Sequence, residues 1–237
     1  MKVLGICGST RPDSNSKTLT NLVLGEIKAR ANGVETELIE LWDKKINECM
    51  YDRCKVQCRR KLNKEGQMVA GFSECVQKDD FGPIFEKMLE ADGIIFSCPV
   101  YFGAAPGHLR SLLNRAGLGG ESAEYYNIIA QRRAAEQGTT YILPTDPKSI
   151  EEGRYGRFRR KLGGAIVTTR RTGANFTYLE LVQWFLIENM FVVPGIYWNI
   201  ALCGAIGARD ALRDEEAVHN LEIFAENFAW ALPRIRG

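Results

Sequence analysis

Polar side chains suited to anion binding gather in a loop near the start of this 237-residue chain, directly after a short apolar run. The loop, Gly8–Thr18, carries Arg11 among hydroxyl and amide side chains, and apolar residues at helical spacing follow it. Free backbone N–H groups and the helix dipole favour negative charge at the start of a helix. The loop therefore predicts a phosphate site, although a polar turn with a helix N-cap gives a similar pattern.

This first loop lacks the glycines of the common nucleotide-binding motifs. Ser16-Lys17-Thr18 imitates the end of a Walker A loop, but Ser16 stands where that motif requires glycine. Nor does the stretch from Gly5 to Gly8 supply the G-x-G-x-x-G turn of dinucleotide sites. A phosphomonoester bound by side-chain hydroxyls therefore fits this loop better than a nucleotide diphosphate.

A second loop, Ser97–Gly107, combines two aromatic side chains with prolines and small residues. Small residues let backbone approach a flat ligand closely. Free backbone N–H groups there are suited to the polar edge of an isoalloxazine ring, with Tyr101 or Phe102 near its face. On the alternative interpretation, Pro99 and Pro106 only end a strand and begin a helix.

Four of the seven cysteines fall in one polar segment, Trp42–Asp80. They are Cys49, Cys54, Cys58 and Cys75. Four soft ligands in one excursion are suited to an iron–sulfur cluster or to zinc, and free thiols are the third interpretation. The other three cysteines lie in or beside apolar runs, which predicts small buried hydrophobic residues.

The elements that must position these loops alternate between short apolar runs and amphipathic helical patterns. The predicted strands are Val3–Cys7, Val34–Leu41, Ile94–Cys98, Ala165–Thr169 and Phe191–Val193. Alternation of this kind predicts an α/β fold with a doubly wound parallel sheet, covered by helices on both faces. Ligands bind such sheets beyond the carboxyl ends of the strands. We expect a single domain over residues 1–237, with insertions at about 42–80 and 119–160.

The first two loops together resemble the NADPH-dependent FMN reductase superfamily. The motifs are Gly-Ser-x-Arg with Asn15 and Ser16, and later Pro-Val-Tyr-Phe-Gly-x-x-Pro-Gly-x-Leu-Arg. The resemblance covers most of the chain outside 119–160, and it implies FMN as cofactor and a flavodoxin-like sheet of order 2-1-3-4-5. It implies phosphate contacts from Ser9, Arg11, Asn15, Ser16 and Thr18. It implies contacts to the ring system from Pro99, Val100, Tyr101, Phe102 and Gly103.

A third loop, Thr168–Gly173, resembles the other flavin-side loop of that family, but it has arginines where the family often has glycines. The resemblance implies flavin contacts from Thr169, Arg170, Arg171 and Gly173. A positive charge near the flavin N1–C2 carbonyl edge would stabilise the anionic hydroquinone, which is one role for the two arginines. Two solvated arginines are the other interpretation.

The cysteine segment resembles the iron–sulfur flavoproteins, a branch of the same superfamily. In that branch the cluster cysteines precede an Asp-Asp pair and a helix, as Asp79 and Asp80 do here. The branch has C-x2-C-x2-C, whereas this chain has C-x4-C-x3-C and sixteen residues before Cys75. The resemblance implies Cys49, Cys54, Cys58 and Cys75 as ligands of a [4Fe-4S] cluster.

Two redox functions follow from the resemblance. One is an NAD(P)H-dependent FMN reductase, and the alternative passes single electrons from ferredoxin through a cluster to FMN. A flavin-binding sensor with no redox activity is a third interpretation. We assign no catalytic side chain, because the flavin carries the chemistry. His108 is expected at the surface or in packing.

Composition bounds the partners and the location. The formal net charge of +2 is too small to favour nucleic acid or an anionic membrane as main partner. No run approaches the roughly 20 apolar residues of a membrane span, and the start of the chain does not read as a signal peptide. We expect a cytoplasmic protein that forms a homo-oligomer, with the 119–160 insertion as a lid, a subunit contact or a docking surface.

Overall fold

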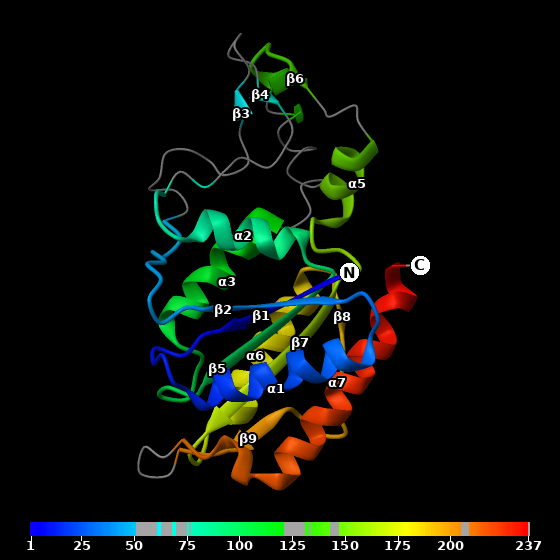
Figure 1. The fold of residues 1–237 in the computed structure, drawn as a ribbon. Coiled ribbons are helices and arrows are strands. Elements are labelled where there is room, and N and C mark those ends of the chain that lie inside the picture. Colours follow the sequence, from blue (N-terminus) through cyan, green and yellow to red (C-terminus); the bar gives the residue numbers. More distant parts are fainter. Residues whose placement is uncertain are drawn as a thin grey trace.

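The described residues form a main sheet of six strands, and all the strand pairs found in it are parallel. The computed structural model describes the chain except residues 51–60, 63–67, 70–74, 76, 121–130, 133, 143–146, 205–208 and 237. The strands are β1 (Lys2–Cys7), β2 (Glu35–Glu40), β5 (Gly93–Pro99), β7 (Leu162–Thr169), β8 (Phe191–Val192) and β9 (Ile200–Leu202). Their order is β2-β1-β5-β7-β8, with β9 also on β7 (Figure 1). Counted along the main sheet, this is the predicted order 2-1-3-4-5 of the flavodoxin-like fold.

Helices cover both faces of this sheet (Figure 1). Those with side chains in the two cores are α1 (Asn15–Arg30) and α7 (Glu215–Arg236) on one face, and α2 (Phe81–Glu90), α3 (Gly107–Gly120) and α6 (Ala174–Ile187) on the other. Successive side chains of a strand point to opposite faces. Ile94 and Phe96 of β5 accordingly enter the core under α2, α3 and α6, and Ile95 enters the core under α1 and α7.

Strand β7 begins three residues before the predicted start at Ala165, because two glycines disguise it in the sequence. A Cβ on Gly163 would lie 2.5 Å from the ring of Phe185 in α6. A Cβ on Gly164 would lie 2.4 Å from the ring of Phe224 in α7. The glycine pair therefore continues the strand and lets one aromatic ring pack directly on each face of the backbone.

The edge of the sheet beside β7 is in two pieces: the predicted fifth strand is present as β8, and β9 is an additional strand beyond it. β8 pairs with the start of β7 at Leu162, and β9 pairs with its end at Thr169. Pro194 and Gly195 lie between the two pieces and interrupt the ladder. β9 was not predicted, because three residues are too few to give a period. Its carboxyl end brings a further loop to the edge where the ligand loops lie.

The two predicted insertions meet each other. β3 (Lys61–Leu62) and β4 (Met68–Val69) come from the cysteine-bearing segment, and β6 (Tyr141–Ile142) comes from the second insertion. β4 pairs with β3 antiparallel and with β6 parallel, which makes a small separate sheet at the top of Figure 1. The second insertion continues through α5 (Pro147–Tyr155) to β7.

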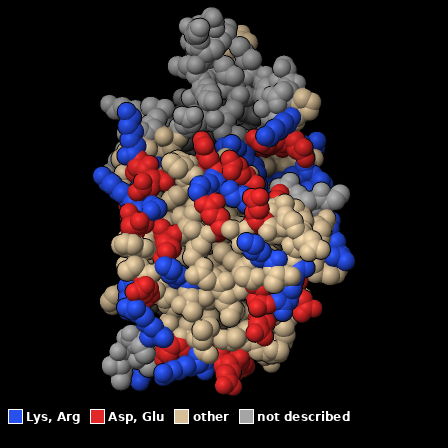
Figure 2. Space-filling view, in the orientation of Figure 1, with Lys and Arg blue, Asp and Glu red and all other residues tan. Residues whose placement is uncertain are grey.

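Helical spacing in the sequence predicts a closing helix over Asp210–Ala231, but the helix α7 (Glu215–Arg236) starts five residues later. A short 3-10 turn, η3 (Ala211–Arg213), precedes α7, and Asp214 separates the two. Within the described part of the chain, no helix has the length and apolar character to span a bilayer. Basic and acidic side chains are interspersed over the face seen in Figure 2, in keeping with the small net charge.

Candidate functional site

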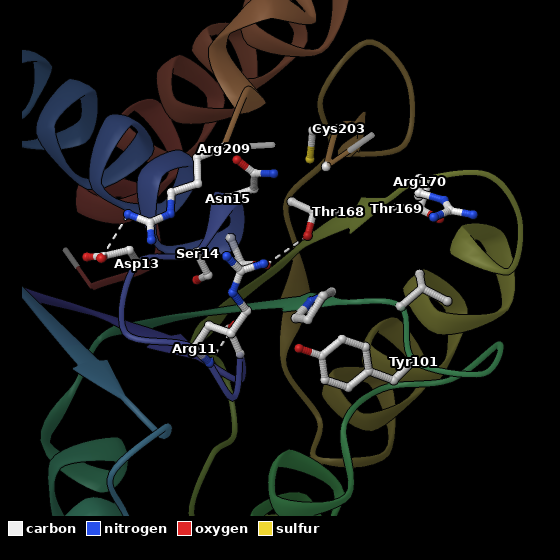
Figure 3. Close-up of a pocket in the computed structure, with 15 residues that line it drawn as sticks. Arg11, Asp13, Ser14, Asn15, Tyr101, Thr168, Thr169, Arg170, Cys203 and Arg209 are labelled. Carbon is white, nitrogen blue, oxygen red and sulfur yellow. Dashed lines mark hydrogen bonds and ion pairs between the residues drawn. The ribbon is translucent and has the colours of Figure 1, made fainter. Parts of the chain in front are cut away.

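A pocket opens where the carboxyl ends of β1, β5, β7 and β9 meet, and the loops after these strands line it (Figure 3). This is the edge at which a doubly wound sheet binds ligands. Fifteen residues line the pocket: Ser9, Arg11, Asp13, Ser14, Asn15, Ser16, Pro99, Val100, Tyr101, Thr168, Thr169, Arg170, Cys203, Gly204 and Arg209.

The first loop wraps the N-terminus of α1 and forms one wall of the pocket. Ser14 is the N-cap, and its Oγ accepts a hydrogen bond of 3.1 Å from the backbone N–H of Lys17. The Oγ of Ser9 accepts from the backbone N–H of Arg11 at 3.2 Å, which leaves the hydroxyl proton of Ser9 to be donated elsewhere. Both serines are buried. The loop is therefore held in shape by its own hydroxyls at the positive end of a sixteen-residue helix.

Hydrogen bonds join the three strand-end loops into one frame. Thr10 Oγ1 lies 3.0 Å from the hydroxyl of Tyr101, which links the first loop to the second. Ser16 Oγ lies 2.9 Å from Thr168 Oγ1, which links the start of α1 to β7. The backbone N–H of Val100 donates to Thr168 O at 2.9 Å. A ligand that enters the pocket meets a cross-braced site.

The second loop contains a tight turn after the pocket-lining residues. Tyr101 and Ala104 exchange backbone hydrogen bonds of 3.0 and 3.2 Å around this turn. Both central residues have positive φ, 50° at Phe102 and 83° at Gly103. The turn carries Phe102 fully into solvent, and an aromatic residue in this left-handed region is strained.

Gly173 presses the third loop against the second. It has φ +88°, and a Cβ there would lie 2.9 Å from Gly103 Cα and 3.0 Å from Val100 Cγ1. Gly173 also begins α6, since its carbonyl accepts hydrogen bonds of 3.1 Å from the backbone N–H and the hydroxyl of Thr177. Only glycine meets both requirements without displacing the neighbouring loop.

Positive charge dominates the pocket walls. Three arginines line it, Arg11, Arg170 and Arg209, against one carboxylate, Asp13. Arg209 Nη1 lies 2.9 Å from Asp13 Oδ2, so this pair ties the loop after β9 to the loop after β1. In Figure 3, Arg11, Asp13 and Arg209 lie together at one end of the pocket, and Tyr101 and Arg170 lie at the other. The arrangement suits an anionic group at the first end and a flat ring beside Tyr101.

Nine of the predicted cofactor residues line this pocket: Ser9, Arg11, Asn15, Ser16, Pro99, Val100, Tyr101, Thr169 and Arg170. The other five lie close by in sequence but outside the lining. Thr18 is on the first turn of α1, where its hydroxyl donates to Ser14 O at 3.2 Å. Phe102 and Gly103 form the exposed turn, Gly173 braces the second loop, and Arg171 is exposed.

Six lining residues were not predicted: Asp13, Ser14, Thr168, Cys203, Gly204 and Arg209. The first three belong to loops that sequence reasoning had already singled out. Arg209 and Cys203 follow the unpredicted strand β9, and Arg209 lies 196 positions after its partner Asp13 in the chain. Burial, and next the carboxylates of Asp210 and Asp214, raise the pKa of Cys203 to about 12. This thiol therefore stays neutral and adds no negative charge to the pocket.

His108 lies at the start of α3 and approaches the first loop. Burial lowers the pKa of His108, against the smaller opposite effect of a hydrogen bond with the backbone of Ser9. Its Nε2 is buried and has no hydrogen-bond partner within the described ranges. The ring is half-buried behind the first loop, as expected of a residue at the surface or in packing.

The predicted metal ligands fall partly outside the described residues. Cys54 and Cys58 lie there, whereas Cys49 and Cys75 are described and are half-buried free thiols. The described residues alone contain no group of three or more candidate ligands. The remaining cysteines, Cys7, Cys98 and Cys203, are buried as expected.

A comparison with known families decides the relationship. The family described as NADPH-dependent FMN reductase matches residues 1–137, more than half of the 237-residue chain. The chain belongs to this family. Membership places it among the flavin oxidoreductases, in agreement with the resemblance read from the two loops.

The chain is also similar to proteins named iron–sulfur flavoproteins. One from Methanocaldococcus jannaschii is 32% identical over 196 residues, which are 81% of this chain and 76% of the relative. One from Methanosarcina thermophila is 33% identical over 215 residues, 87% of each chain. Among solved structures, the chain is similar to RosB with a bound 8-demethyl-8-formylriboflavin-5'-phosphate, with a TM-score of 0.67. This match covers all of the present chain and 80% of the RosB chain. At 14% identity the last similarity shows the fold alone.

Proposed function

We propose that this protein is an FMN-dependent oxidoreductase that holds FMN non-covalently in the pocket at the ends of β1, β5, β7 and β9. The observation that carries the proposal is the convergence of a helix N-terminus and three arginines on one braced pocket that also offers an aromatic wall. When bound, the flavin supplies the electron transfer, and the chain supplies binding, orientation and charge.

The phosphate of FMN fits the end of the pocket at the start of α1. The backbone there and the hydroxyl proton of Ser9 are donors, and Arg11 is the charged partner. Asn15 and Ser16 complete this wall, although each already contacts another part of the fold. Thr18 acts behind them, by tying the first turn of the helix to Ser14 O.

The ring system fits the other end, between the second and third loops. Pro99, Val100 and Tyr101 form one wall, and Thr169 with Arg170 forms the next. Arg170 is the cation best placed to stabilise negative charge on the reduced ring. Arg171, Phe102 and Gly103 border the entrance, and Gly173 sets the separation of the two loops.

Titration of apoprotein with FMN and with riboflavin tests this orientation. Arg11→Ala should weaken FMN binding about ten- to a hundredfold, because a hydrogen bond to a charged group contributes roughly 1.5–3 kcal/mol. Riboflavin lacks the phosphate, so its affinity should not change. Arg30→Ala is the matched control, since Arg30 lies in the last turn of α1, at the opposite end of that helix from the first loop, and is paired with Glu26. Equal losses for both ligands, or no loss for FMN, would contradict the assignment.

NAD(P)H is the proposed electron donor, as the family description implies. Anaerobic mixing of the FMN-loaded protein with NADPH or NADH should bleach the flavin absorption within seconds. A flavin that stays oxidised with both nicotinamides but is reduced by reduced ferredoxin would replace this donor with the alternative one.

That alternative, an iron–sulfur flavoprotein that passes single electrons through a [4Fe-4S] cluster to FMN, is the second candidate. The similarity to two proteins named iron–sulfur flavoproteins favours it. Thiol ligands suit the group, and the Sγ of Cys75 already accepts a hydrogen bond from Arg115. Cys49, Cys54, Cys58 and Cys75 would hold the cluster. Anaerobic protein should then contain about four irons per chain.

We also propose that the chain forms a homo-oligomer through an apolar groove of about 600 Å³ between α6 and the segment from β8 to β9. Tyr197 and Trp198 are exposed in this segment, and Trp198 stacks on Tyr178. Trp198→Glu should lower the mass seen by sedimentation. Trp230→Glu changes an exposed tryptophan outside this groove, on α7, and should not lower the mass.

A further inference from the structure

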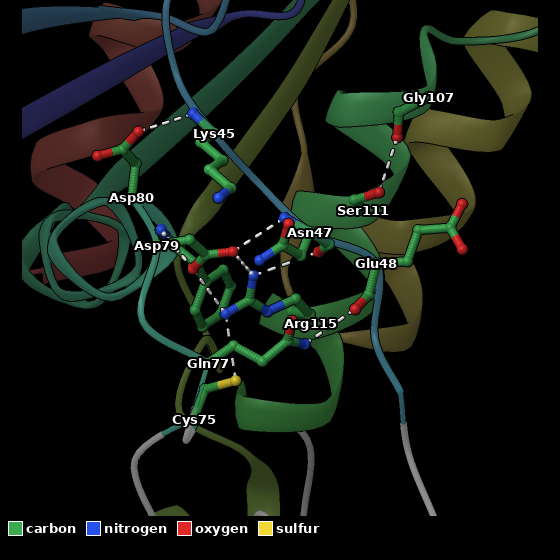
Figure 4. A network of polar contacts seen from close by, with 11 residues as sticks. Lys45, Asn47, Glu48, Cys75, Gln77, Asp79, Asp80, Gly107, Ser111 and Arg115 are labelled. Carbon is green, nitrogen blue, oxygen red and sulfur yellow. Dashed lines mark hydrogen bonds and ion pairs between the residues drawn. The ribbon is translucent and has the colours of Figure 1, made fainter. Parts of the chain in front are cut away.

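The two ends of the cysteine segment are held side by side before the segment departs from the fold (Figure 4). Lys45 and Asp80 exchange hydrogen bonds, with Lys45 N donating to Asp80 Oδ2 at 2.7 Å and Asp80 N donating to Lys45 O at 3.0 Å. Further along, Gln77 Nε2 donates to Glu48 O at 2.9 Å. These contacts form a stem, residues 45–48 against 77–80, with Cys49 and Cys75 next to it.

The buried carboxylate of Asp79 stabilises this stem by accepting hydrogen bonds from backbone groups. Its Oδ2 accepts from the backbone N–H of Asn47 at 2.8 Å, and its Oδ1 accepts from the N–H of Phe81 at 3.2 Å. Its side chain is fully buried. Burial alone would raise the pKa of Asp79, but hydrogen bonds from Arg115 and from these N–H groups outweigh it and hold the pKa below its usual range. The carboxylate is thus charged and fixed.

Arg115 of α3 connects the stem to the flavodoxin-like core and to a cysteine. Its guanidinium forms a fork on Asp79, with Nη1–Oδ2 at 2.5 Å and Nη2–Oδ1 at 3.0 Å. Nη1 also donates to Asn47 O at 3.2 Å. The guanidinium lies 4.1 Å from the ring centroid of Phe81. With a side chain that is 2% exposed, Arg115 is locked in one geometry.

The same guanidinium reaches Cys75. Arg115 Nη2 donates to Cys75 Sγ at 3.2 Å (Figure 4). Its Nε is buried and has no acceptor in the part of the chain that the structure describes. A buried cation with one N–H group on a thiol and another unsatisfied is suited to a site where thiolate and sulfide gather negative charge.

We propose that Arg115 is a positioning residue for the iron–sulfur site: the Asp79–Arg115 pair fixes the stem, and Arg115 donates a hydrogen bond to the Cys75 sulfur that ligates the cluster. This rests on the second candidate function above. Hydrogen bonds to ligand sulfurs stabilise the more negative, reduced cluster, so the Arg115 contact raises its reduction potential. It also orients Cys75, as hydrogen bonds to metal ligands commonly do.

Arg115→Lys tests the proposal in the full-length protein, purified anaerobically. Lysine keeps the charge and can pair with Asp79, but its compact ammonium lacks the planar fork that holds both carboxylate oxygens, Asn47 O and the Cys75 sulfur at once. Arg110→Lys is the matched control, because Arg110 is an arginine of the same helix whose Nε lies 2.7 Å from Glu180 Oε1 instead. Three quantities are measured: FMN and iron per chain, the rate at which a chelator removes iron, and the cluster midpoint potential by EPR-monitored titration.

Arg115→Lys should keep its FMN, lose iron to the chelator about tenfold faster or more, and shift the midpoint potential to a more negative value. Arg110→Lys should match the wild type in all three. Equal iron retention and equal potentials in Arg115→Lys and the wild type would overturn the proposal alone. Wild-type protein with FMN and no iron would overturn the proposal and the second candidate function, but not the flavin function. Protein without FMN would count against the flavin function alone.

A measurement on the wild type keeps the proposal open to refutation if Arg115→Lys does not fold. Pulsed EPR of the reduced cluster in protein labelled with [15N]arginine should give a nitrogen coupling transmitted through the N–H···S bond. Absence of that coupling would overturn the proposal.

Discussion

Replacing Gly173 by alanine should damage both the fold and the FMN site, because two separate constraints meet at this residue. The first is backbone conformation, since a residue other than glycine at φ +88° costs roughly 1–2 kcal/mol. The second is crowding, since the new Cβ would lie 2.9 Å from Gly103 Cα and 3.0 Å from Val100 Cγ1. Overpacking of this kind costs about 1–3 kcal/mol. The sum predicts a loss of about 2–5 kcal/mol.

Gly103→Ala provides a control that carries only the first constraint. Gly103 has φ +83°, and nothing lies within 4 Å of a Cβ built on it. Both substitutions restrict the unfolded chain equally, so this contribution cancels in their difference. Gly173→Ala should therefore be less stable than Gly103→Ala by about 1–3 kcal/mol in urea unfolding of the apoprotein.

FMN titration separates the two ways in which the crowding is relieved. If the second loop moves away from the new methyl group, the free energy of unfolding falls less, but the FMN site is distorted. A cost of about 1–3 kcal/mol then appears as roughly 5- to 150-fold weaker FMN binding. The two losses together should thus exceed those of Gly103→Ala. Equal stability and equal FMN affinity in the two variants would refute the inference that Gly173 sets the separation of the loops.

Three further outcomes follow from buried or strained groups. Because burial lowers the pKa of His108, the unfolded chain binds more protons than the folded protein below about pH 6.5. The free energy of unfolding should therefore fall as the pH falls from about 7 to 5. His108→Gln removes this group, so its free energy of unfolding, measured in urea, should change less over the same pH range. Phe102→Gly should leave the free energy of unfolding unchanged or raise it by up to about 1 kcal/mol, since the ring is exposed and φ is 50°. A loss of stability in thermal unfolding would count against backbone strain at Phe102. Trp184→Phe leaves Leu113 O without the 2.9 Å bond from Nε1, and denaturant unfolding should give a loss of about 1–3 kcal/mol with FMN affinity unchanged.

The sheet was predictable because its strands are short, apolar and regularly spaced. Errors arose where a strand depends on its neighbours more than on its own pattern. Gly163 and Gly164 break the apolar run in the sequence, yet Phe185 and Phe224 fill the space above and below them. β9 has only three residues and gains its place from pairing with Val167–Thr169.

The pocket was predictable to the extent that its residues follow long strands. The loops after β1, β5 and β7 carry recognisable residue types, and nine residues named from them line the pocket. Arg209 and Cys203 carried no such signal, because they follow the short β9 and reach the pocket only through the tertiary fold. Arg171 differs from Arg170 by one position, and only the backbone at the end of β7 decides which of them lines the pocket.

The wide spacing of the cysteines is a weaker argument against the proposed cluster site because the stem, residues 45–48 against 77–80, already closes the segment that carries them. Sixteen residues between Cys58 and Cys75 depart from the compact motif of the iron–sulfur flavoprotein branch. The entropy of closing a loop grows only with the logarithm of its length, and most of it is already lost once the ends are joined. Here Asp79 joins the ends, because its carboxylate accepts a hydrogen bond from the backbone N–H of Asn47, 32 positions earlier in the chain, and Arg115 bonds to both residues. Because the segment is closed at its base, Cys49 and Cys75 each lie next to one side of the same stem without closely spaced cysteines between them, and Arg115 is the residue through which that argument can be tested.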